Sequence, residues 1–458
     1  MPSWKELIVM RPRRGSGDLR APRRTARDCA PTGGEISDNP RPMRAKTKRP
    51  AVALLIGVAC ALSGSTRAQP ASQPIPLCPG LTIVTAVRQQ NGDYESIKTI
   101  ESVSANAVRL KYSAEMMNSD WLESGPPLKR VNMFRTVLAQ DLRTATQYQQ
   151  VYLDRSAETI PGTTAIGVSA ATLTALKTQG QAALSISTAY GGLELTADAD
   201  KRPNYYDYLS AGTIARVGKA TVPISVLVND TPVSLHAIHA QGELAGDKSE
   251  FYILDDEGNP LVLAFRIGIG AIEPLDAAMT EICDGLRKGG VSFAQIPGGE
   301  RCLNPNGGDR DTLRVVKITY SCAVAPANAS TPAGTADPIE RALVENRRAE
   351  VYSIHFSFNS DRIREESEPT LSQIAGLLAR HADWKLSIEG HTDGIGADSA
   401  NLDLSRRRAA AVKAALVTRY QIDGNRLSTG GFGKSQPKDT NDTLEGRARN
   451  RRVELARQ

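Results

Sequence analysis

Two neighbouring stretches decide the fold of the C-terminal part of this chain: IEGHTDG at residues 388–394 and NLDLSRRRAAAV at residues 401–412. The first begins apolar and ends in polar residues and glycine, which is typical of a strand that runs into a turn. The second places apolar residues at helical spacing among charged ones. Together they predict a strand, a polar turn and an amphipathic helix.

The sequence around these stretches alternates between strand and helix patterns. We expect strands at 351–358, 384–388, 426–430 and 452–455, and helices at 367–380 and 401–420. The residues expected to face the core are Leu371, Ile374, Ala375 and Leu378 in the first helix, and Leu404, Ala411, Val412, Ala415 and Leu416 in the second. This order predicts a small α/β sandwich of the βαβαβ type.

Two further motifs complete the pattern: FSFNS at residues 356–360 and GRARNRRVE at residues 446–454. With the two opening stretches they resemble, in order and spacing, the OmpA C-terminal-like family, which includes peptidoglycan-associated lipoproteins and flagellar motor stator proteins. The resemblance covers about 338–458, roughly a quarter of the chain. It implies a domain that binds peptidoglycan in the envelope of a Gram-negative cell.

The resemblance also implies a binding site for the diaminopimelate of the stem peptide. The free end of that residue carries an ammonium and a carboxylate on one carbon, so a site for it needs an anion and a cation close together. The family positions fall on Asp393 for the ammonium and on Arg408, a bidentate donor, for the carboxylate. Secondary hydrogen bonds are expected from Asn359, Thr392, Asn401 and Arg451.

Each of these residues also has a structural interpretation. Thr392 and Asp393 could close a turn through side-chain bonds to the backbone. The run 406–408 could be a solvated helix face, and Asn401 could be the N-cap of its helix. We assign His391 to structure. Asn359 stands where some family members carry Asp, which affects secondary contacts only.

The region before the OmpA-like domain divides into two parts. Residues 323–337 are rich in Ala and Pro and predict an extended linker. Residues 69–322 predict a strand-rich domain of unknown function, mostly β with a few helices. Expected strands include 82–87, 107–112, 222–228 and a hairpin of 251–254 with 261–265, and expected helices are 169–177 and 274–288.

The middle region offers two weak metal motifs. His236, His239 and Glu243 are expected on a strand, where a spacing of three places side chains on opposite faces. The acidic run 255–257 is better explained as a hairpin tip than as a calcium loop. We find no nucleophile motif, no paired catalytic carboxylates and no phosphate-binding loop, so we expect no catalytic residues, no metal and no cofactor, and we predict that the protein is not an enzyme.

The cysteines and the leader indicate export. Residues 43–68 have the charged start, short apolar run and small-residue end of a signal peptide. Residues 1–42 are interpreted as a mis-called start, with a disordered extension as the alternative, and lipidation at Cys60 stays open. Four cysteines remain and allow three pairings. We favour Cys283–Cys302 and Cys78–Cys322.

Charge and composition exclude one class of partner. Residues 1–68 hold 14 of the 56 basic and 5 of the 50 acidic residues, so the rest has 42 basic and 45 acidic residues and a net charge of −3. The basic balance therefore belongs to the leader and does not indicate nucleic-acid binding. Hydrophobic content of 40% and charged content of 23% are typical of globular domains.

The sequence therefore predicts an exported cell-envelope protein, in the periplasm or at the periplasmic face of the outer membrane. It would bind peptidoglycan non-covalently and anchor a middle domain or the outer membrane to the wall. Two alternatives stay open: an outer-membrane β-barrel with a periplasmic wall anchor, and a wall-targeted hydrolase with its site in the middle domain. The partner of the middle domain and the oligomeric state are not predicted.

Overall fold

A computed structural model of the chain describes residues 74–88, 94–117, 128–149, 158–187, 209–288, 302, 306–309, 311–322 and 337–458. The predicted leader with its signal peptide, the lipidation at Cys60 and nearly all of the predicted linker lie outside the described residues. Residues 69–458 form one compact unit. We call residues 74–322 the middle region and residues 337–458 the C-terminal region.

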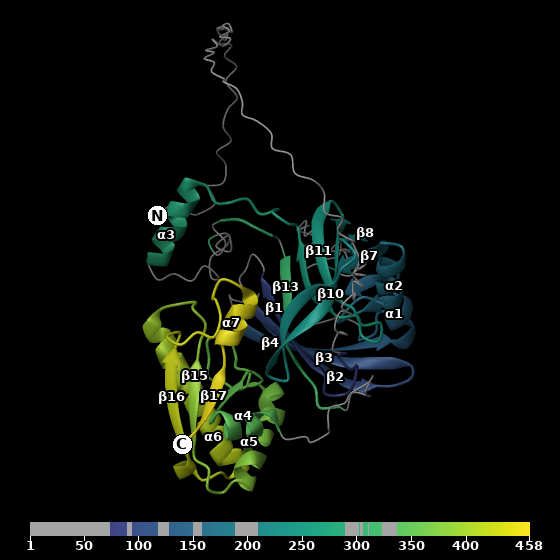
Figure 1. Cartoon of the computed structure of the whole chain (residues 1–458). Helices are drawn as coiled ribbons and strands as arrows, with labels where there is room; N and C mark the ends of the chain where they lie inside the picture. Colours follow the sequence, from purple (N-terminus) through teal and green to yellow (C-terminus); the bar gives the residue numbers. More distant parts are fainter. Residues whose placement is uncertain are drawn as a thin grey trace, which may run out of the picture. The chain divides into compact units, whose positions relative to one another are not determined.

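The middle region is built mainly of strands (Figure 1). They are β1 (Thr82–Arg88), β2 (Tyr94–Val103), β3 (Ala107–Met117), β4 (Leu128–Leu138), β5 (Gln147–Gln149), β6 (Thr163–Thr164), β7 (Gln181–Ser187), β8 (Leu209–Arg216), β9 (Val222–Val228), β10 (Thr231–Leu244), β11 (Asp247–Leu254), β12 (Val262–Ile267) and β13 (Asp311–Thr319). The strand-rich character predicted for this region is therefore confirmed.

These strands form one sheet in the order β4-β3-β2-β1-β13-β12-β11-β10-β8-β7-β5-β6, with most neighbours antiparallel. Strand β10 is long: residues 237–244 pair with β11, whereas residues 231–237 pair with β9. Because β9 also pairs in parallel with β13, the sheet curls back on itself. Apolar side chains from β1 to β4 and β9 to β13 fill one continuous core, and a second core lies between α2 and the strands β7 to β12.

Three helices accompany this sheet: α1 (Ala139–Thr144), α2 (Ala170–Thr178) and α3 (Ala277–Lys288). Helix α2 begins after Ser169, whose hydroxyl accepts a hydrogen bond from the Thr172 N–H and caps the helix. The disulfides are Cys78–Cys322 and Cys283–Cys302, as favoured from the sequence. The first joins the two ends of the middle region.

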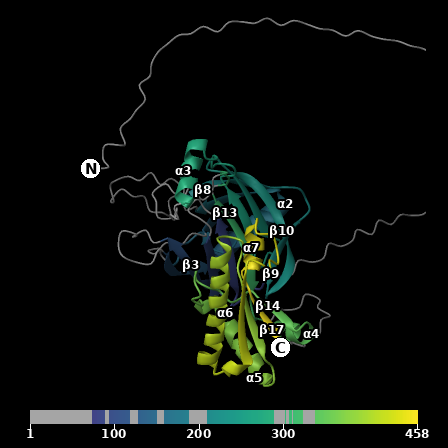
Figure 2. The ribbon, with the colours of Figure 1, turned by 90° about the vertical axis from the view of Figure 1, so that its left-hand side faces the viewer.

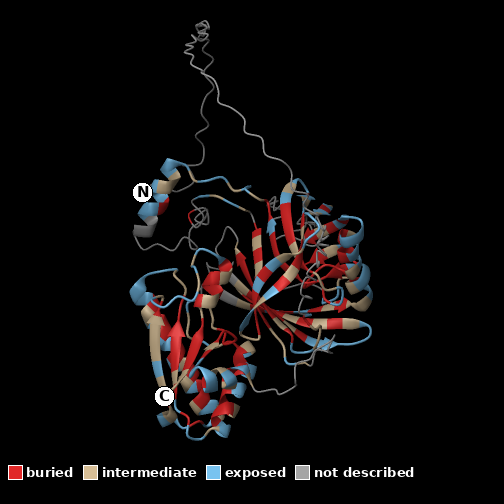
Figure 3. Ribbon diagram, in the orientation of Figure 1, coloured by how far each residue is buried: buried red, intermediate tan, exposed pale blue. Residues whose placement is uncertain are grey.

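The C-terminal region has a separate four-stranded sheet, ordered β14-β17-β15-β16. Its strands are β14 (Arg348–Val351), β15 (Leu386–His391), β16 (Leu427–Gly433) and β17 (Val453–Arg457); its helices are α4 (Pro338–Glu345), α5 (Glu368–Arg380), α6 (Asp398–Tyr420) and α7 (Leu444–Asn450), with 3-10 turns η6 (Glu365–Ser367) and η7 (Gly424–Arg426). The core lies between this sheet and helices α4, α5 and α6, and appears red in Figure 3.

Helix α6 packs unusually close to the sheet and runs along it in Figure 2. A Cβ atom on Gly390 of β15 would lie 2.2 Å from the Ser405 carbonyl oxygen, and one on Gly431 of β16 would lie 2.5 Å from the Arg406 nitrogen. Only glycine allows these approaches. The parallel pair β15 and β16, joined through α6, thereby fixes the helix beside the end of β15.

Three expected boundaries were wrong. The strand expected at 351–358 ends at Val351, because the backbone N–H groups beyond it donate to side chains: Tyr352 to Asp230 Oδ1 and His355 to Ser367 Oγ. The helix expected at 274–288 begins at Ala277, since Asp276 accepts from the Met279 N–H. The helix expected from residue 401 begins three residues earlier, after Ala397, which provides no side-chain cap.

Among the residues that the structure describes, no helix combines the length and apolar character that crossing a membrane requires.

Candidate functional site

Asp393 lies in the turn that follows β15, where the sequence places it. Its Oδ1 accepts a hydrogen bond from the Ile395 N–H at 3.1 Å, and its Oδ2 accepts one from Arg451 Nη1 at 2.7 Å. The side chain is 16% exposed. Asp393 therefore closes its turn through one carboxylate oxygen and pairs with Arg451 through the other.

Arg408 differs from the two arginines that precede it. Arg406 and Arg407 are exposed, and Arg407 pairs with Asp403 and Asp361, as expected of a solvated helix face. Arg408 is only 8% exposed. This burial distinguishes Arg408 from the two exposed arginines before it.

The Arg408 guanidinium is held by the loop that carries the FSFNS motif. Its Nε donates to the Ser360 carbonyl oxygen at 3.0 Å, and its carbon lies 4.9 Å from the centroid of the Phe356 ring. Burial, with a smaller contribution from the nearby Arg451, lowers the pKa of Arg408 to about 10, although Asp393 acts in the opposite direction. Arg408 is therefore still cationic at neutral pH.

Arg451 connects the C-terminal site to the middle region. One of its terminal nitrogens donates to Asp393, and the other donates to Glu95 of β2. Burial alone would lower the pKa of Arg451, but Glu95 and Asp393 outweigh it and raise that pKa. Conversely, burial would raise the pKa of Glu95, but Arg451 and Lys317 hold it below its usual range. Both shifts favour the charged forms of Glu95 and Arg451.

The other three predicted site residues occupy different positions. Thr392 and Asn401 are buried, and each makes a local bond: Thr392 Oγ1 donates to the Asp393 carbonyl oxygen at 3.0 Å, and Asn401 Nδ2 donates to the Ile395 carbonyl oxygen at 2.9 Å. Asn401 lies inside α6 and is not its N-cap. Asn359 is exposed with φ of 48° and lies next to the Ser360 carbonyl that Arg408 contacts.

Two asparagines that sequence reasoning missed position the Asp393 turn. Asn441 Oδ1 accepts from the Gly394 N–H at 2.6 Å and from Asn450 Nδ2 at 3.0 Å. Asn450 is fully buried and also accepts from the N–H groups of Lys438 and Asp439. Asn450 belongs to the GRARNRRVE motif, so the motif marked the segment but not this role.

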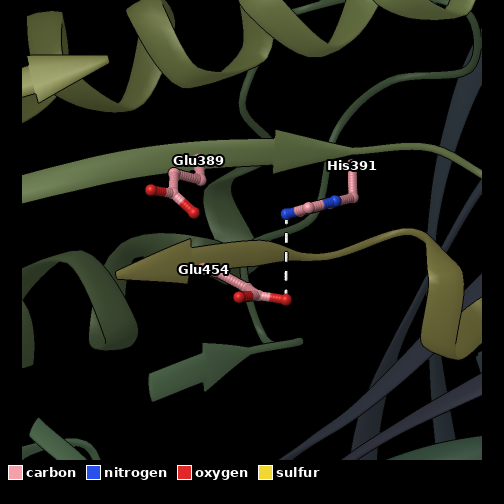
Figure 4. Close-up of side chains that lie close together, drawn as sticks. All are labelled: Glu389, His391 and Glu454. Atoms are coloured by element: carbon pink, nitrogen blue, oxygen red, sulfur yellow. Dashed lines mark ion pairs between the residues drawn. The ribbon is translucent and has the colours of Figure 1, made fainter. Parts of the chain in front are cut away.

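One cluster near the site has the composition of a metal centre. Ligand atoms of Glu389, His391 and Glu454 all lie within 4.8 Å of one another (Figure 4). Both ring nitrogens of His391 are buried and make no hydrogen bond to any described residue. The ring stacks on Phe432, with the centroids 5.2 Å apart. Burial lowers the pKa of His391 to about 4, and Arg452 adds to this effect.

The two carboxylates of this cluster are already neutralised by cations. Arg348 pairs with Glu389 and, at 2.7 Å, with Glu454, and Arg452 Nε donates to Glu454 at 2.8 Å. A divalent ion would have to displace these side chains. The cluster therefore fits a buried, charge-balanced part of the sheet better than a metal site.

The histidines of the middle region also have partners other than a metal. His236 and His239 lie on β10, as the sequence predicts. His236 Nδ1 is 3.2 Å from Thr221 Oγ1, and His239 Nε2 is 2.7 Å from Glu250 Oε1. His239 also stacks on Tyr252, with the ring centroids 4.7 Å apart. In the acidic run 255–257, the Asp256 side chain closes the turn by accepting a hydrogen bond from the Gly258 N–H at 2.9 Å.

The C-terminal region is an OmpA-family domain: the sequence model of the OmpA family matches residues 355–451. This interval contains Asp393, Arg408 and Arg451, so the charged cluster described above lies within the matched segment. The resemblance stated from the four motifs is thus confirmed for this part of the chain.

Three named relatives each match a part of the chain. Outer membrane protein A of Bordetella avium is 48% identical over 101 residues, which are 22% of this chain and 51% of the relative. Outer membrane porin F of Pseudomonas aeruginosa is 35% identical over 146 residues, 32% of this chain and 40% of the relative. The peptidoglycan-associated lipoprotein of Rhizobium meliloti is 38% identical over 100 residues, 22% of this chain and 56% of the relative. The chain thus covers under two thirds of each of these relatives.

Proposed function

We propose that this chain is an exported cell-envelope protein that binds peptidoglycan non-covalently and anchors its middle region, or the outer membrane, to the cell wall. The observation that carries the proposal is the cluster of Asp393, Arg408 and Arg451, two cations and an anion that come from the turn after β15, from α6 and from the end of α7. The names of the relatives, which are outer-membrane and peptidoglycan-associated proteins, support the envelope location.

The ligand in this proposal is the diaminopimelate of the stem peptide. Asp393 would bind its ammonium, and the guanidinium of Arg408 would bind its carboxylate. Phe356 and Ser360 hold this guanidinium in one orientation. A planar guanidinium that is fixed before binding loses little freedom when it forms two parallel hydrogen bonds. Asn359, Thr392, Asn401 and Arg451 would complete the pocket.

We also propose the domain organisation inferred from the sequence: a leader, a strand-rich domain at 69–322, a linker at 323–337, and an α/β sandwich of the βαβαβ type at 338–458. The separate sheets of the middle and C-terminal regions support this division. The mechanism is binding, and no bond is made or broken at the site.

Co-sedimentation with purified sacculi tests the proposal. The mature full chain should pellet with the sacculi, and Asp393→Ala and Arg408→Ala should lower the bound fraction at least about tenfold, the effect of about 1.4 kcal/mol. Arg407→Ala is the matched control, because Arg407 is exposed on the same helix beside Arg408. Equal pelleting of all four proteins, with unchanged thermal unfolding, would show that these residues do not form the binding site.

A further inference from the structure

The proposed wall-binding site is in contact with a carboxylate of the middle region. Glu95 of β2 accepts a hydrogen bond from the Arg451 nitrogen that does not contact Asp393. The side chains of Glu95 and Arg451 are each 26% exposed. Both terminal nitrogens of Arg451 are therefore occupied, one by each region of the chain.

A second carboxylate of the middle region holds the loop that carries Asn359. Glu115 Oε2 of β3 accepts from the Phe358 N–H at 2.6 Å. This loop also supplies the Ser360 carbonyl that orients Arg408. Lys317 of β13 lies close enough to act electrostatically on both Glu95 and Arg408. Strands β2, β3 and β13 thus place charged groups along the site.

Further polar contacts join the two regions. Arg364 Nη2 donates to Ser113 Oγ at 2.9 Å, and Arg130 Nη2 donates to Glu366 Oε2 at 2.8 Å. In addition, Asp230 Oδ2 accepts from Ser353 Oγ at 2.8 Å. These bonds join residues that are more than a hundred positions apart in sequence, so they depend on the packing of the two regions.

The apolar part of this interface is small. It consists of a cluster of buried side chains from β1, β2, β13 and α7: Val84, Ala86, Ile97, Val316, Leu444 and Ala448. The main cores of the middle and C-terminal regions are separate clusters. Interfaces of this kind within a chain resemble those of transient complexes, which separate and re-form, whereas a large hydrophobic interface would not.

From these contacts we infer that the middle region closes the wall-binding site. In the closed state the Glu95 carboxylate occupies the place of the ligand carboxylate beside Arg408 and Arg451. This inference rests on the proposed function and adds its regulation. Binding to the wall then requires strand β2 to leave Arg451, and Glu95 of the middle region competes with peptidoglycan for the cations of the C-terminal region.

Closure by the middle region accounts for the burial of the proposed binding residues. Arg408 is 8%, Asn401 6% and Thr392 4% exposed, although a polymeric wall has to reach all three in the proposed function. The two cavities described for this chain lie elsewhere, one beside Ile166 and Asn259 and one along α3. Glu95, Asp393, Arg408 and Arg451 together also balance their charges without a ligand.

The test is a titration of the full chain with sacculi. We compare wild type with Glu95→Ala, with the double variant Glu95→Ala/Glu115→Ala and with Glu95→Ala/Asp393→Ala. Glu101→Ala is the matched control, because Glu101 lies on the same strand, carries the same charge and pairs with Arg109 within the middle region. Thermal unfolding of every variant verifies that it folds.

Closure predicts that Glu95→Ala half-saturates at a sacculus concentration at least about threefold lower than wild type, and the Glu95/Glu115 double variant lower still. Glu101→Ala should match wild type, and adding Asp393→Ala should abolish the gain. If wild type binds through Asp393 but Glu95→Ala binds equally or more weakly, closure is wrong while the proposed function stands. If neither wild type nor Glu95→Ala pellets, the proposed function itself fails.

Discussion

At the scale of single residues, Glu454 illustrates how charge is balanced inside the C-terminal sheet. Its side chain is 4% exposed and accepts hydrogen bonds from Arg452, which is 1% exposed, and from the partly exposed Arg348. Removing one partner of a buried pair is costly because the other charge loses its compensation. The stability of the sheet therefore depends on the Glu454 carboxylate.

Glu454→Gln should lower the free energy of unfolding by about 3 kcal/mol, the lower end of the cost of breaking a buried ion pair. Urea unfolding measures this loss. Glu101→Gln is the control and should change the free energy by less than about 1 kcal/mol, because the Glu101–Arg109 pair is partly exposed. A loss below about 1 kcal/mol in Glu454→Gln would contradict the charge balance described here.

The same residues predict an acid-sensitive stability. Burial would raise the pKa of Glu454, but Arg348 and Arg452 outweigh it and lower that pKa to about 2. Because the unfolded carboxyl group takes up its proton near pH 4.5, the unfolded state binds more protons between pH 4.5 and 2, and the stability contributed by Glu454 is lost over that window. His391, with its pKa lowered to about 4, adds a loss as pH falls from 6.5 to 4.

Chemical unfolding at pH 7, 5 and 3 checks this dependence. The free energy of unfolding should decrease at each step. In Glu454→Gln the part of the decrease between pH 5 and 3 that Glu454 supplies should be missing. A variant whose pH profile ran parallel to that of wild type would show that Glu454 does not carry it.

At the scale of secondary-structure elements, the close packing of α6 on β15 positions the site. Gly390 precedes Asp393 by three residues, and Arg408 lies one turn along α6 from Ser405, the residue that Gly390 contacts. The distance between sheet and helix therefore sets the distance between the proposed anion and cation. A side chain at Gly390 would push the two elements apart.

Gly390→Ala should destabilise the chain by about 1–3 kcal/mol, the range for overpacking, and should also weaken sacculus binding. Gly376→Ala in α5 is the matched control: its nearest contact would be the flexible Arg380 at 3.6 Å, so it should be neutral or stabilising. Thermal unfolding and co-sedimentation measure the two effects. Equal stability of the two variants would contradict the packing argument.

The sequence alone predicted some of the helices and strands and failed for others. The helix at 367–380 was predicted nearly to the residue, because Leu371, Ile374 and Leu378 repeat at helical spacing and are buried. The strand expected at 351–358 failed, because its backbone bonds go to Asp230 and Ser367, and no local pattern reports such distant partners.

The sequence likewise predicted some residues of the candidate site and missed others. Asp393 and Arg408 were expected from motifs; Asp393 lies two residues after the end of β15, and Arg408 lies on the buried side of α6. Glu95 was not expected, since it is 356 positions from Arg451 in sequence and belongs to no motif. The roles of Asn441 and Asn450 were missed because side-chain amides that fix a loop leave no periodic signal in the sequence.

At the scale of the whole molecule, the two disulfides constrain the chain very differently. Cys78–Cys322 closes a loop with a sequence separation of 244, and Cys283–Cys302 closes one of 19. In the chain-entropy description a cross-link stabilises by restricting the unfolded state, and the effect grows with loop length. The bridge between the ends of the middle region should therefore contribute more.

Replacing both Cys78 and Cys322 by Ala should cost about 5 kcal/mol, against about 3 kcal/mol for replacing Cys283 and Cys302. Urea unfolding of the two double variants under non-reducing conditions gives the comparison. A larger loss on removing the short bridge would show that local packing around α3, and not loop length, determines the contribution.

The central claim, that Asp393 and Arg408 bind the free end of diaminopimelate, is tested most directly by calorimetric titration of the mature full chain with two soluble stem tripeptides. One ends in diaminopimelate and the other in lysine, which has no second carboxylate on its side chain. Because Arg408 needs that carboxylate, the diaminopimelate peptide should bind at least about tenfold more tightly, and Arg408→Ala should erase the difference while Arg407→Ala keeps it. Equal affinity of wild type for both peptides, or no binding of either, would contradict the claim.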